Sequence, residues 1–407
     1  MLEMEVKHKF YRDNNRLSAI DLFAGAGGLS LAAKNSGIDV LAAVEFDNIA
    51  TETYRKNIVD SDFPTCVFNQ DINDVDIQGL MKYQGLKKGQ LDILLGGPPC
   101  QGFSSHRIKN SGVDDPRNKL LLRYFDFVKE LMPKVFLVEN VPGLLWERHK
   151  MYLANFTKET KKLGYKIICN KPIILNAKDY GVPQNRKRAF ILAVRNDVYE
   201  KRIQWPPAPT HFNPNNKLPT WKTASTVFEK PSKKILDELH KIYSKKNDWT
   251  KDESSKFIKS LEFGTPVAKD DPCNIHMNHT PALTERFQQT PLNGSREDID
   301  FTLPCHVNYK GHKDVYGRIF FHLPANTITT GCNNPSKGRF VHPWKNHGIT
   351  LRHAARLQTF PDEFVFLGNS TEQARQIGNA VPIKLGEVLL DSIIEQILFK
   401  PNLKAVI

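Results

Sequence analysis

The stretch LSAIDLFAGAGGLSLAAKNSG (residues 17–37) carries an apolar strand into a helix through a turn rich in glycine. Residues 17–24 are typical of a buried strand, and residues 28–37 form a helical pattern that Gly37 closes. A strand that passes through a short turn into a helix is the opening unit of a parallel α/β sheet. This stretch therefore predicts the fold class of the first half of the chain.

Further apolar segments repeat the same unit. They predict strands at 40–46, 65–71, 91–97 and 134–141. A helix is predicted after Asp115-Pro116, because apolar residues follow with helical spacing at positions 121, 124, 125, 128 and 131. The alternation of strands and helices predicts a doubly wound α/β sheet.

The chain changes character near residue 192. Residues 205–219 are rich in proline, residues 220–345 are polar, basic and irregular, and helical patterns return near the C-terminus. We therefore predict two domains. Residues 1–192, completed by 345–407, form the α/β domain, and residues 193–344 form a smaller, irregular domain inserted between its two parts.

The composition is ordinary for a soluble protein, but the charge is not. The 407 residues carry a formal net charge of +13, which is typical of a protein with a polyanionic partner, nucleic acid being the commonest, and equally of a merely lysine-rich soluble protein. The six cysteines are scattered without a C-x-x-C pair, so neither a zinc ribbon nor a disulfide framework is indicated. No apolar run approaches the ~20 residues that cross a bilayer, and the charged N-terminus does not resemble a secretory signal. We expect a cytoplasmic, nucleoid-associated protein that binds no membrane.

The glycine turn is a candidate ligand site. Gly25, Gly27 and Gly28 let a ligand approach the backbone at the start of a helix. Glu45 ends the next predicted strand 20 residues after Gly25, where an acidic side chain commonly binds ribose hydroxyls, and Asp71 ends the third. Each feature alone is also typical of an ordinary turn or cap. Together they favour a cofactor that contains adenosine.

The segment GGPPCQGFS (residues 96–104) places Cys100 at the carboxyl end of the fourth predicted strand, where ligands bind in open α/β sheets. Two prolines stiffen the approach to this thiol. Glu139 ends the fifth predicted strand and is expected beside Cys100. A thiol and a carboxylic acid together suit attack on an electron-poor ring, with protonation of a ring nitrogen. A lone cysteine is more often a packing residue, but packing needs no such rigid setting.

The segment QNRKR (residues 184–188) predicts an extended strand in which Gln184, Arg186 and Arg188 share one face. These side chains can reach phosphates and a substrate ring. A basic strand at the surface would have the same pattern.

These motifs, in this order, resemble those of the bacterial DNA cytosine-5 methyltransferases of restriction-modification systems. The matching segments are DLFAGAGGLS (21–30), GGPPCQGFS (96–104), VENV (138–141), QNRKR (184–188), RLQTFPDEF (356–364) and QIGNAVP (376–382), with Glu45 and Asp71. The resemblance covers about residues 1–192 and 345–407. It implies a Rossmann-like fold that binds S-adenosylmethionine, with 193–344 as the target-recognition domain.

The resemblance implies that S-adenosylmethionine donates the methyl group, leaves as S-adenosylhomocysteine, and needs no metal. Glu45 would hold the ribose of this cofactor and Asp71 its adenine. The residues expected around it are Phe23, Ala24, Gly25, Gly27, Gly28, Glu45, Phe46, Asp71, Ile72, Gly97, Pro99, Asn379 and Ala380.

The catalytic residues that the resemblance implies are Cys100, Glu139, Arg186 and Arg188. Cys100 would attack C6 of a cytosine flipped out of duplex DNA, and Glu139 would bond N3 and the amino group. Arg188 would contact the base, Arg186 would support the loop, and residues 104–118 would close over the base. The candidate DNA contacts are Gln101, Ser104, Arg107, Gln184, Thr327, Thr329, Lys337 and Arg339.

Double-stranded DNA is the expected partner, a cognate restriction endonuclease would act separately, and the chain is expected to be a monomer. One alternative is a tRNA cytosine-5 methyltransferase, which shares the catalytic set but has a shorter recognition region and a Cys-Phe-Thr signature that this chain does not contain. Another is an inactive DNA-binding relative, which the presence of Cys100 and Glu139 disfavours. A nicotinamide oxidoreductase is disfavoured because Ser30 stands where G-x-G-x-x-G needs its third glycine.

Overall fold

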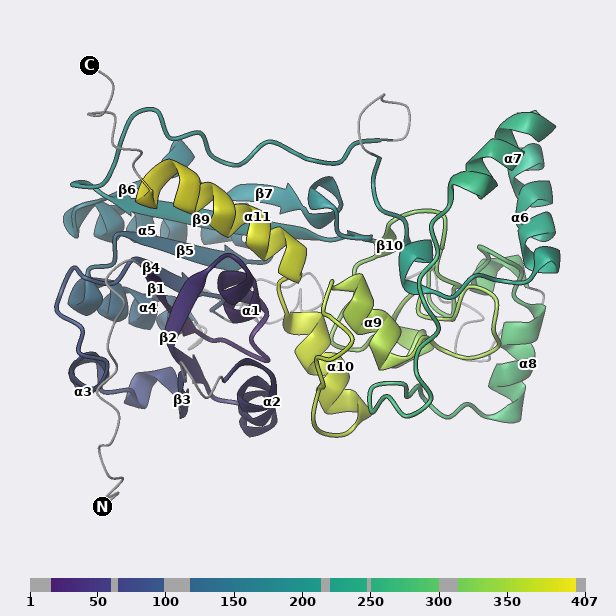
Figure 1. The fold of residues 1–407 in the computed structure, drawn as a ribbon, viewed down its shortest axis with the longest axis horizontal. Helices are drawn as coiled ribbons and strands as arrows, with labels where there is room; N and C mark the ends of the chain where they lie inside the picture. The colour runs from purple at the N-terminus through teal and green to yellow at the C-terminus, as the bar shows by residue number, and fades with distance from the viewer. Residues whose placement is uncertain are drawn as a thin grey trace.

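The computed structural model describes residues 16–59, 65–98, 118–213, 220–246, 250–299 and 314–399. Within them the largest element is an eight-stranded sheet with the order β3-β2-β1-β4-β5-β9-β6, in which β7 also pairs with β9 (Figure 1). The strands are β1 Leu17–Leu22, β2 Ile38–Glu45, β3 Cys66–Asn69, β4 Ile93–Gly96, β5 Val135–Asn140, β6 Tyr165–Ile167, β7 Ile173–Asn176 and β9 Lys187–Arg195.

The five strands predicted from the sequence are all present, and they pair in parallel. β9 runs antiparallel to β5, β6 and β7. The sequence did not reveal β6 and β7, which have 3 and 4 residues and are too short to show a periodicity. Because β9 is antiparallel to β5, its first residues lie at the same edge as the carboxyl ends of β1 to β5.

Helices cover both faces of the sheet (Figure 1). α1 (Gly28–Asn35), α2 (Asn48–Ile58) and α11 (Ile383–Ile393) share one apolar core, while α3 (Ile77–Tyr83), α4 (Asn118–Leu131) and α5 (Lys150–Lys162) share the other. α11 packs closely on α1 at Gly386, where a Cβ would lie 2.7 Å from the Cβ of Ala32. Both ends of the chain therefore build one face of the sheet. No helix in the described ranges is long and apolar enough to cross a membrane.

The inserted part contains helices that the sequence pattern did not reveal. α6 (Lys233–Lys246), α7 (Lys251–Ser260) and α8 (Pro281–Gln289) stand apart from the sheet, at the right of Figure 1. The many lysines of α6 and α7 dilute the apolar periodicity, so this segment resembles an irregular one. Start signals were nevertheless present, because Thr250 and Glu253 form a capping box before α7 and Thr280 caps α8.

The predicted boundary near residue 192 lies within β9, which continues to Arg195. The proline-rich segment after β9 contacts elements of the sheet domain. Trp205 is buried in an apolar core that the sheet shares with inserted residues such as Phe228, and the hydroxyl of Tyr180 donates to the Pro207 carbonyl at 3.0 Å. The segment that contains Trp205 and Pro207 therefore packs against the sheet domain.

The close contact of α10 (Ser370–Asn379) with the end of the insertion gives a stability prediction. A Cβ at Gly378 would lie 2.3 Å from the backbone C of Thr329 and N of Thr330. Backbone atoms cannot rotate away, so we expect Gly378→Ala to lower the free energy of unfolding by about 3 kcal/mol.

The matched control is Gly79→Ala, where the Cβ would meet first the carboxylate tip of Asp76, at 2.4 Å. That side chain can move aside, so the control should be nearly neutral. Urea unfolding of both variants makes the comparison. Equal stability of the two would show that segment 329–330 has room to shift.

Candidate active site

Six chain segments meet at one edge of the sheet. Neighbouring strands lie about 4.8 Å apart, so groups at consecutive strand ends come close together. Following the strand order from β3 to β9, the edge carries Asp71, Glu45, the glycine turn after β1, Gly97, Glu139 and Arg188. The residues predicted to bind cofactor and those predicted to act on substrate therefore occupy adjacent halves of one edge.

Glu45 holds the glycine turn in place. Its carboxylate accepts the N–H of Gly25 at 2.8 Å and that of Asp47 at 2.7 Å. Burial raises the pKa of Glu45, and the N–H donors oppose that shift. Gly25 has a φ of +58°, and a Cβ there would meet no atom within 4 Å, so space is open beside the turn. Carboxylate oxygens have further lone pairs, so Glu45 can still accept hydroxyl groups.

The C-terminal part of the chain also packs against the glycine turn. A Cβ at Gly28 would lie 2.9 Å from the Val381 carbonyl oxygen and 3.4 Å from the Cβ of Ala380. This close approach places Ala380 beside the turn, with Asn379 exposed next to it. The two distant motifs expected to share the cofactor thus meet here.

The adjacent strand ends offer a ring-stacking surface beside an acceptor. Phe46 is 73% exposed directly after Glu45, whereas Ile72 is buried. Asp71 accepts the Asn73 N–H at 2.8 Å and so caps the short helix that begins at Ile72. A flat aromatic group with a hydrogen-bond donor, such as adenine, fits this combination.

Asp21 lies beneath the glycine turn and was not singled out by the sequence. It is 1% exposed. Its Oδ2 accepts the Ser30 hydroxyl at 2.6 Å, and that hydroxyl accepts from Tyr54 at 2.8 Å. Oδ1 is buried without a hydrogen-bond partner in the described part of the chain. Burial raises the pKa of Asp21 to about 7, although the Ser30 hydrogen bond opposes it.

The raised pKa of Asp21 predicts a pH dependence of stability. The folded state binds this proton more tightly than the unfolded chain, so the stability it contributes is full below about pH 4 and is lost as the pH rises through about 7. The Asp21→Asn side chain cannot titrate. Relative to that variant, the free energy of unfolding of the wild type should fall by about 1.4 kcal/mol per pH unit across most of this window. Urea unfolding of both proteins between about pH 5 and 8 measures the difference. A difference that is constant with pH would contradict the raised pKa.

Glu139 and Arg188 form an ion pair on the other half of the edge. Arg188 Nε lies 2.9 Å from Glu139 Oε1, and both side chains are largely buried. Burial raises the pKa of Glu139, while the positive charges of Arg188 and Arg186 lower it. A Cβ at Gly97 would lie 3.4 Å from Glu139 Oε2, so the chain leading toward Cys100 passes this carboxyl. A carboxyl with a raised pKa can serve as a general acid.

Arg186 joins three separate segments. It is fully buried and donates to the carbonyls of Ile328 and Gly378 at 2.7 Å each, and to that of Ala380 at 3.0 Å. Arg186 therefore ties segments 328 and 378–380 to its own strand, and its expected support of the loop stays a prediction.

Two predicted DNA contacts need correction. Gln184 has no exposed surface, donates to Gln358 Oε1 at 2.8 Å and accepts the Ile328 N–H at 2.8 Å. Arg339 is 7% exposed and donates to Asp314 and to backbone carbonyls that include that of Gly294. The alternation predicted for 184–188 is present, but its shared face points into the protein. We therefore assign both side chains to holding loops rather than to contacting DNA.

The other predicted DNA contacts are placed at the surface or lie outside the described residues. Thr327 and Thr329 are half-buried, Lys337 is exposed, and Thr327 donates to the Asn185 carbonyl at 2.8 Å. The predictions that lie outside the described residues are Pro99, Cys100, Gln101, Ser104 and Arg107.

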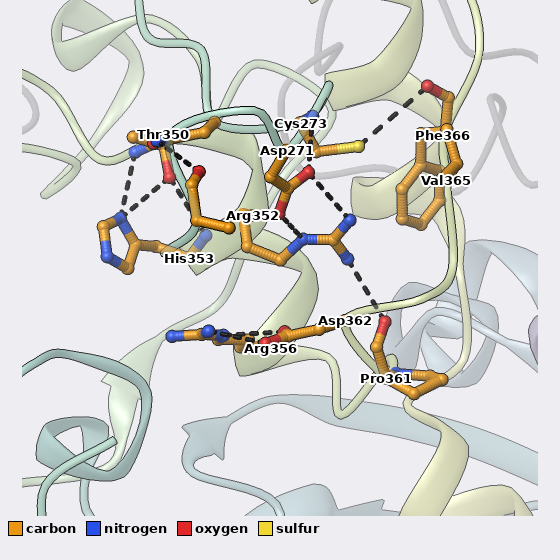
Figure 2. Close-up of polar contacts among 12 residues, drawn as sticks. Asp271, Cys273, Thr350, Arg352, His353, Arg356, Pro361, Asp362, Val365 and Phe366 are labelled. Atoms are coloured by element: carbon orange, nitrogen blue, oxygen red, sulfur yellow. Dashed lines mark hydrogen bonds and ion pairs between the residues drawn. The ribbon is translucent and has the colours of Figure 1, made fainter. Parts of the chain in front are cut away.

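α9 (Leu351–Leu357) links the inserted part to the sheet domain through two arginines one turn apart (Figure 2). Arg352 is fully buried and donates hydrogen bonds to both carboxylate oxygens of Asp271, at 2.5 and 3.1 Å. Arg356 pairs with Asp362 and donates to the Thr265 carbonyl at 2.7 Å. The sequence did not reveal the pair of Arg352 and Asp271, because its members are 81 positions apart.

One cluster of possible metal ligands occurs among the described residues. The ligand atoms of Glu229, His342 and His353 lie within 4.8 Å of one another. However, Nδ1 of His342 accepts the N–H of Trp344 at 3.3 Å and of Lys345 at 3.2 Å. A neutral histidine with an accepting Nδ1 carries its proton on Nε2, which then has no lone pair for a metal. The hydrogen bonding therefore disfavours a metal at this place.

A family model described as C-5 cytosine-specific DNA methylase matches residues 17–395. The Type II methyltransferase M.XorII of Xanthomonas oryzae pv. oryzae is 31% identical over 394 residues, which cover 94% of this chain and 86% of that protein. The Type II methyltransferase M1.HphI of Haemophilus parahaemolyticus is 31% identical over 380 residues, which cover 93% and 87%.

Solved structures share the fold. A putative DNA modification methyltransferase encoded within an E. coli prophage has a TM-score of 0.63 at 24% identity and covers 93% of this chain and 99% of its own. The Entamoeba histolytica methyltransferase EhMeth has a TM-score of 0.56 at 17% identity and covers 95% and 99%. The expected Rossmann-like methyltransferase fold is confirmed.

Proposed function

The chain belongs to the family of C-5 cytosine-specific DNA methylases, and we propose that it methylates C5 of a flipped-out cytosine at a specific site in duplex DNA through a covalent bond to Cys100. The observation that carries this proposal is the shared sheet edge. The Glu139–Arg188 pair lies beside the glycine turn that Glu45 holds, with Gly97 between them leading toward Cys100.

The cofactor half of this edge fits S-adenosylmethionine. Space is open at Gly25, Glu45 retains lone pairs for ribose hydroxyls, and Phe46 offers a stacking surface near Asp71. When bound, the cofactor supplies an electrophilic methyl group and becomes S-adenosylhomocysteine.

Cys100 and Glu139 would make the cytosine ring reactive. The Cys100 thiolate forms an S–C6 bond. The C5=C6 electron pair then moves to the C4–C5 bond, the C4=N3 pair moves onto N3, and N3 takes the proton of Glu139. C5 is then nucleophilic enough to accept a methyl group. Loss of the C5 proton to solvent restores the double bond, expels the thiolate and returns the N3 proton to Glu139. The raised pKa of Glu139 favours the protonated form that this step needs.

The inserted part would choose the target. We assign DNA recognition to residues 220–344, where Lys337 is exposed and Thr329 half-buried close to α10. The base must leave the duplex to reach Cys100, which costs a few kcal/mol that phosphate contacts can offset. We also propose a modification role beside a separate endonuclease, which the relatives named Type II methyltransferases support. We expect the chain to act as a monomer.

Methyl-labelled S-adenosylmethionine tests the proposed function. The protein is incubated with unmethylated duplex DNA and, separately, with bulk tRNA. We expect label in DNA, and bisulfite sequencing of the product then gives the site. Label in tRNA alone would assign the protein to RNA methylation, and no label in either would contradict methyl transfer.

A further inference from the structure

The part of the site assigned to adenine rests on a short turn at the margin of the sheet. The helix η1 (Ile72–Asp74) follows β3, which has 4 residues and stands at the end of the strand order. Asp71 caps this turn, and its Oδ1 accepts both the backbone N–H and the side-chain Nδ2 of Asn73, at 2.8 Å each. Because both donors use one oxygen, Oδ2 is left for a ligand.

Arg123 on α4 holds this turn from the side of the core. Its Nε donates to the Ile72 carbonyl at 3.0 Å, and its Nη2 donates to the Val75 carbonyl at 2.8 Å. The Val75 N–H reaches the same Ile72 carbonyl only at 3.4 Å, so the arginine makes the shorter of the two bonds. A guanidinium is planar and donates in a fixed geometry, so it sets both the separation and the direction of the two carbonyls.

The guanidinium of Arg123 is itself held in place. Its Nη1 pairs with Asp126 at 3.1 Å, about one turn further along α4. It also lies 5.3 Å from the centre of the Phe127 ring, which is fully buried in the core that α3, α4 and α5 share. Ile72 and Val75 are buried in the same core, so loss of Arg123 should shift the turn rather than unfold it.

We propose that Arg123 is a positioning residue that sets Asp71 against the 6-amino group of adenine, so that the site distinguishes a 6-amino from a 6-oxo purine. A carboxylate oxygen accepts a hydrogen bond from an amino group, but it repels a carbonyl oxygen. A hydrogen bond weakens as its angle departs from linear, so the direction of the carboxylate decides how large this preference is. The inference rests on the proposed function, since it takes S-adenosylmethionine as the ligand of this half of the edge.

The test measures the binding of S-adenosylhomocysteine and of its 6-oxo analogue by calorimetry, which needs no methyl transfer. Arg123→Met keeps the apolar stem beside Phe127 but has no donors for the two carbonyls. We expect the Kd for S-adenosylhomocysteine to rise about tenfold, the loss of about one hydrogen bond, and the Kd for the 6-oxo analogue to change less than about twofold. In methylation assays the KM for S-adenosylmethionine should rise by the same factor, with kcat at saturating cofactor nearly unchanged.

Arg195→Met is the matched control. Arg195 ends β9, pairs with Asp197 at 2.7 Å and donates to the Gly89 carbonyl at 3.1 Å. Its side chain is 16% exposed and that of Arg123 is 21% exposed, but it lies at the opposite end of the sheet from Asp71. This variant should unfold at a lower urea concentration and keep both Kd values. Loss of the preference for the 6-amino ligand in both variants alike would indicate a general defect and would overturn the positioning role.

Arg123→Lys keeps the test decisive if the methionine variant does not fold. A lysine retains the charge but cannot bridge two carbonyls, so the preference for the 6-amino ligand should fall about threefold. Kd values that rise equally for both ligands, or not at all, would overturn the inference. Equal wild-type affinity for the two ligands, with methyl transfer intact, would also overturn it. A wild type that prefers S-adenosylhomocysteine but transfers no methyl group to DNA would instead contradict the proposed function alone.

Discussion

Replacing Cys100 with alanine is expected to lower kcat for DNA methylation by at least about 10³-fold. C5 of cytosine is a poor nucleophile until a group adds at C6, and the variant has no group to add. The Kd for S-adenosylmethionine should remain within about twofold of the wild-type value, since the cofactor residues at Glu45 and Asp71 are untouched. Transfer of labelled methyl groups to duplex DNA measures the loss.

Cys169→Ser is the control for general effects of removing a thiol. Cys169 is exposed and donates to the Trp205 carbonyl at 3.0 Å, on the segment that packs along the sheet domain. This variant should methylate DNA at the wild-type rate. Substantial methylation by the Cys100→Ala protein would refute the covalent mechanism while leaving family membership intact.

Glu139→Gln should lower kcat about 10³-fold, within the range that loss of a general acid causes. The amide keeps the size of the side chain but has no acidic proton for N3. It also leaves the buried guanidinium of Arg188 without its 2.9 Å ion-pair partner, so some stability is lost as well. Single-turnover methylation with saturating cofactor measures the chemical step.

Asp92→Asn separates the loss of stability from the loss of catalysis. Asp92 is also a buried carboxylate, accepts the Ser18 N–H at 2.8 Å and pairs with Lys134 at 2.7 Å, but it lies just before β4, at the opposite end of that strand from Gly97. The Asp92→Asn variant should lose a similar amount of stability, but its kcat should stay within about threefold of the wild-type value. If Glu139→Gln reacts as fast as this control, the carboxyl is not the acid.

The positions of Glu45 and Asp71 at one edge of the sheet were predictable because their signals are local. An apolar run followed at once by glycine or an acidic residue indicates a strand end, and parallel strand ends share one edge of the sheet. Glu45 and Asp71 were found in this way, and the structure places both at that edge. The predicted bounds of the strands differ from the observed ones by a few residues, since the last residues of an apolar run can already belong to the turn.

The errors at Gln184 and Arg339 have a common cause. Each polar side chain was taken to face DNA because of the motif in which it stands, yet both side chains satisfy buried carbonyls or amides of other segments. The identity of a residue gives the chemistry of its side chain, but it does not say whether solvent or protein surrounds that side chain. Helices α6 and α7 were missed for a related reason, because their many lysines hide the apolar positions.

The sequence by itself determined the α/β class, the places of the first five strands in the chain, the family and the types of groups available for chemistry. All of these rest on short segments whose residues are neighbours in the chain. Only the tertiary structure decided which groups meet across it, such as Arg352 with Asp271, 81 positions apart, and Arg186 with Ile328, 142 positions apart. It also decided that Arg123 reaches the Ile72 carbonyl, because burial and long-range pairing depend on how segments pack, and no local pattern records that packing.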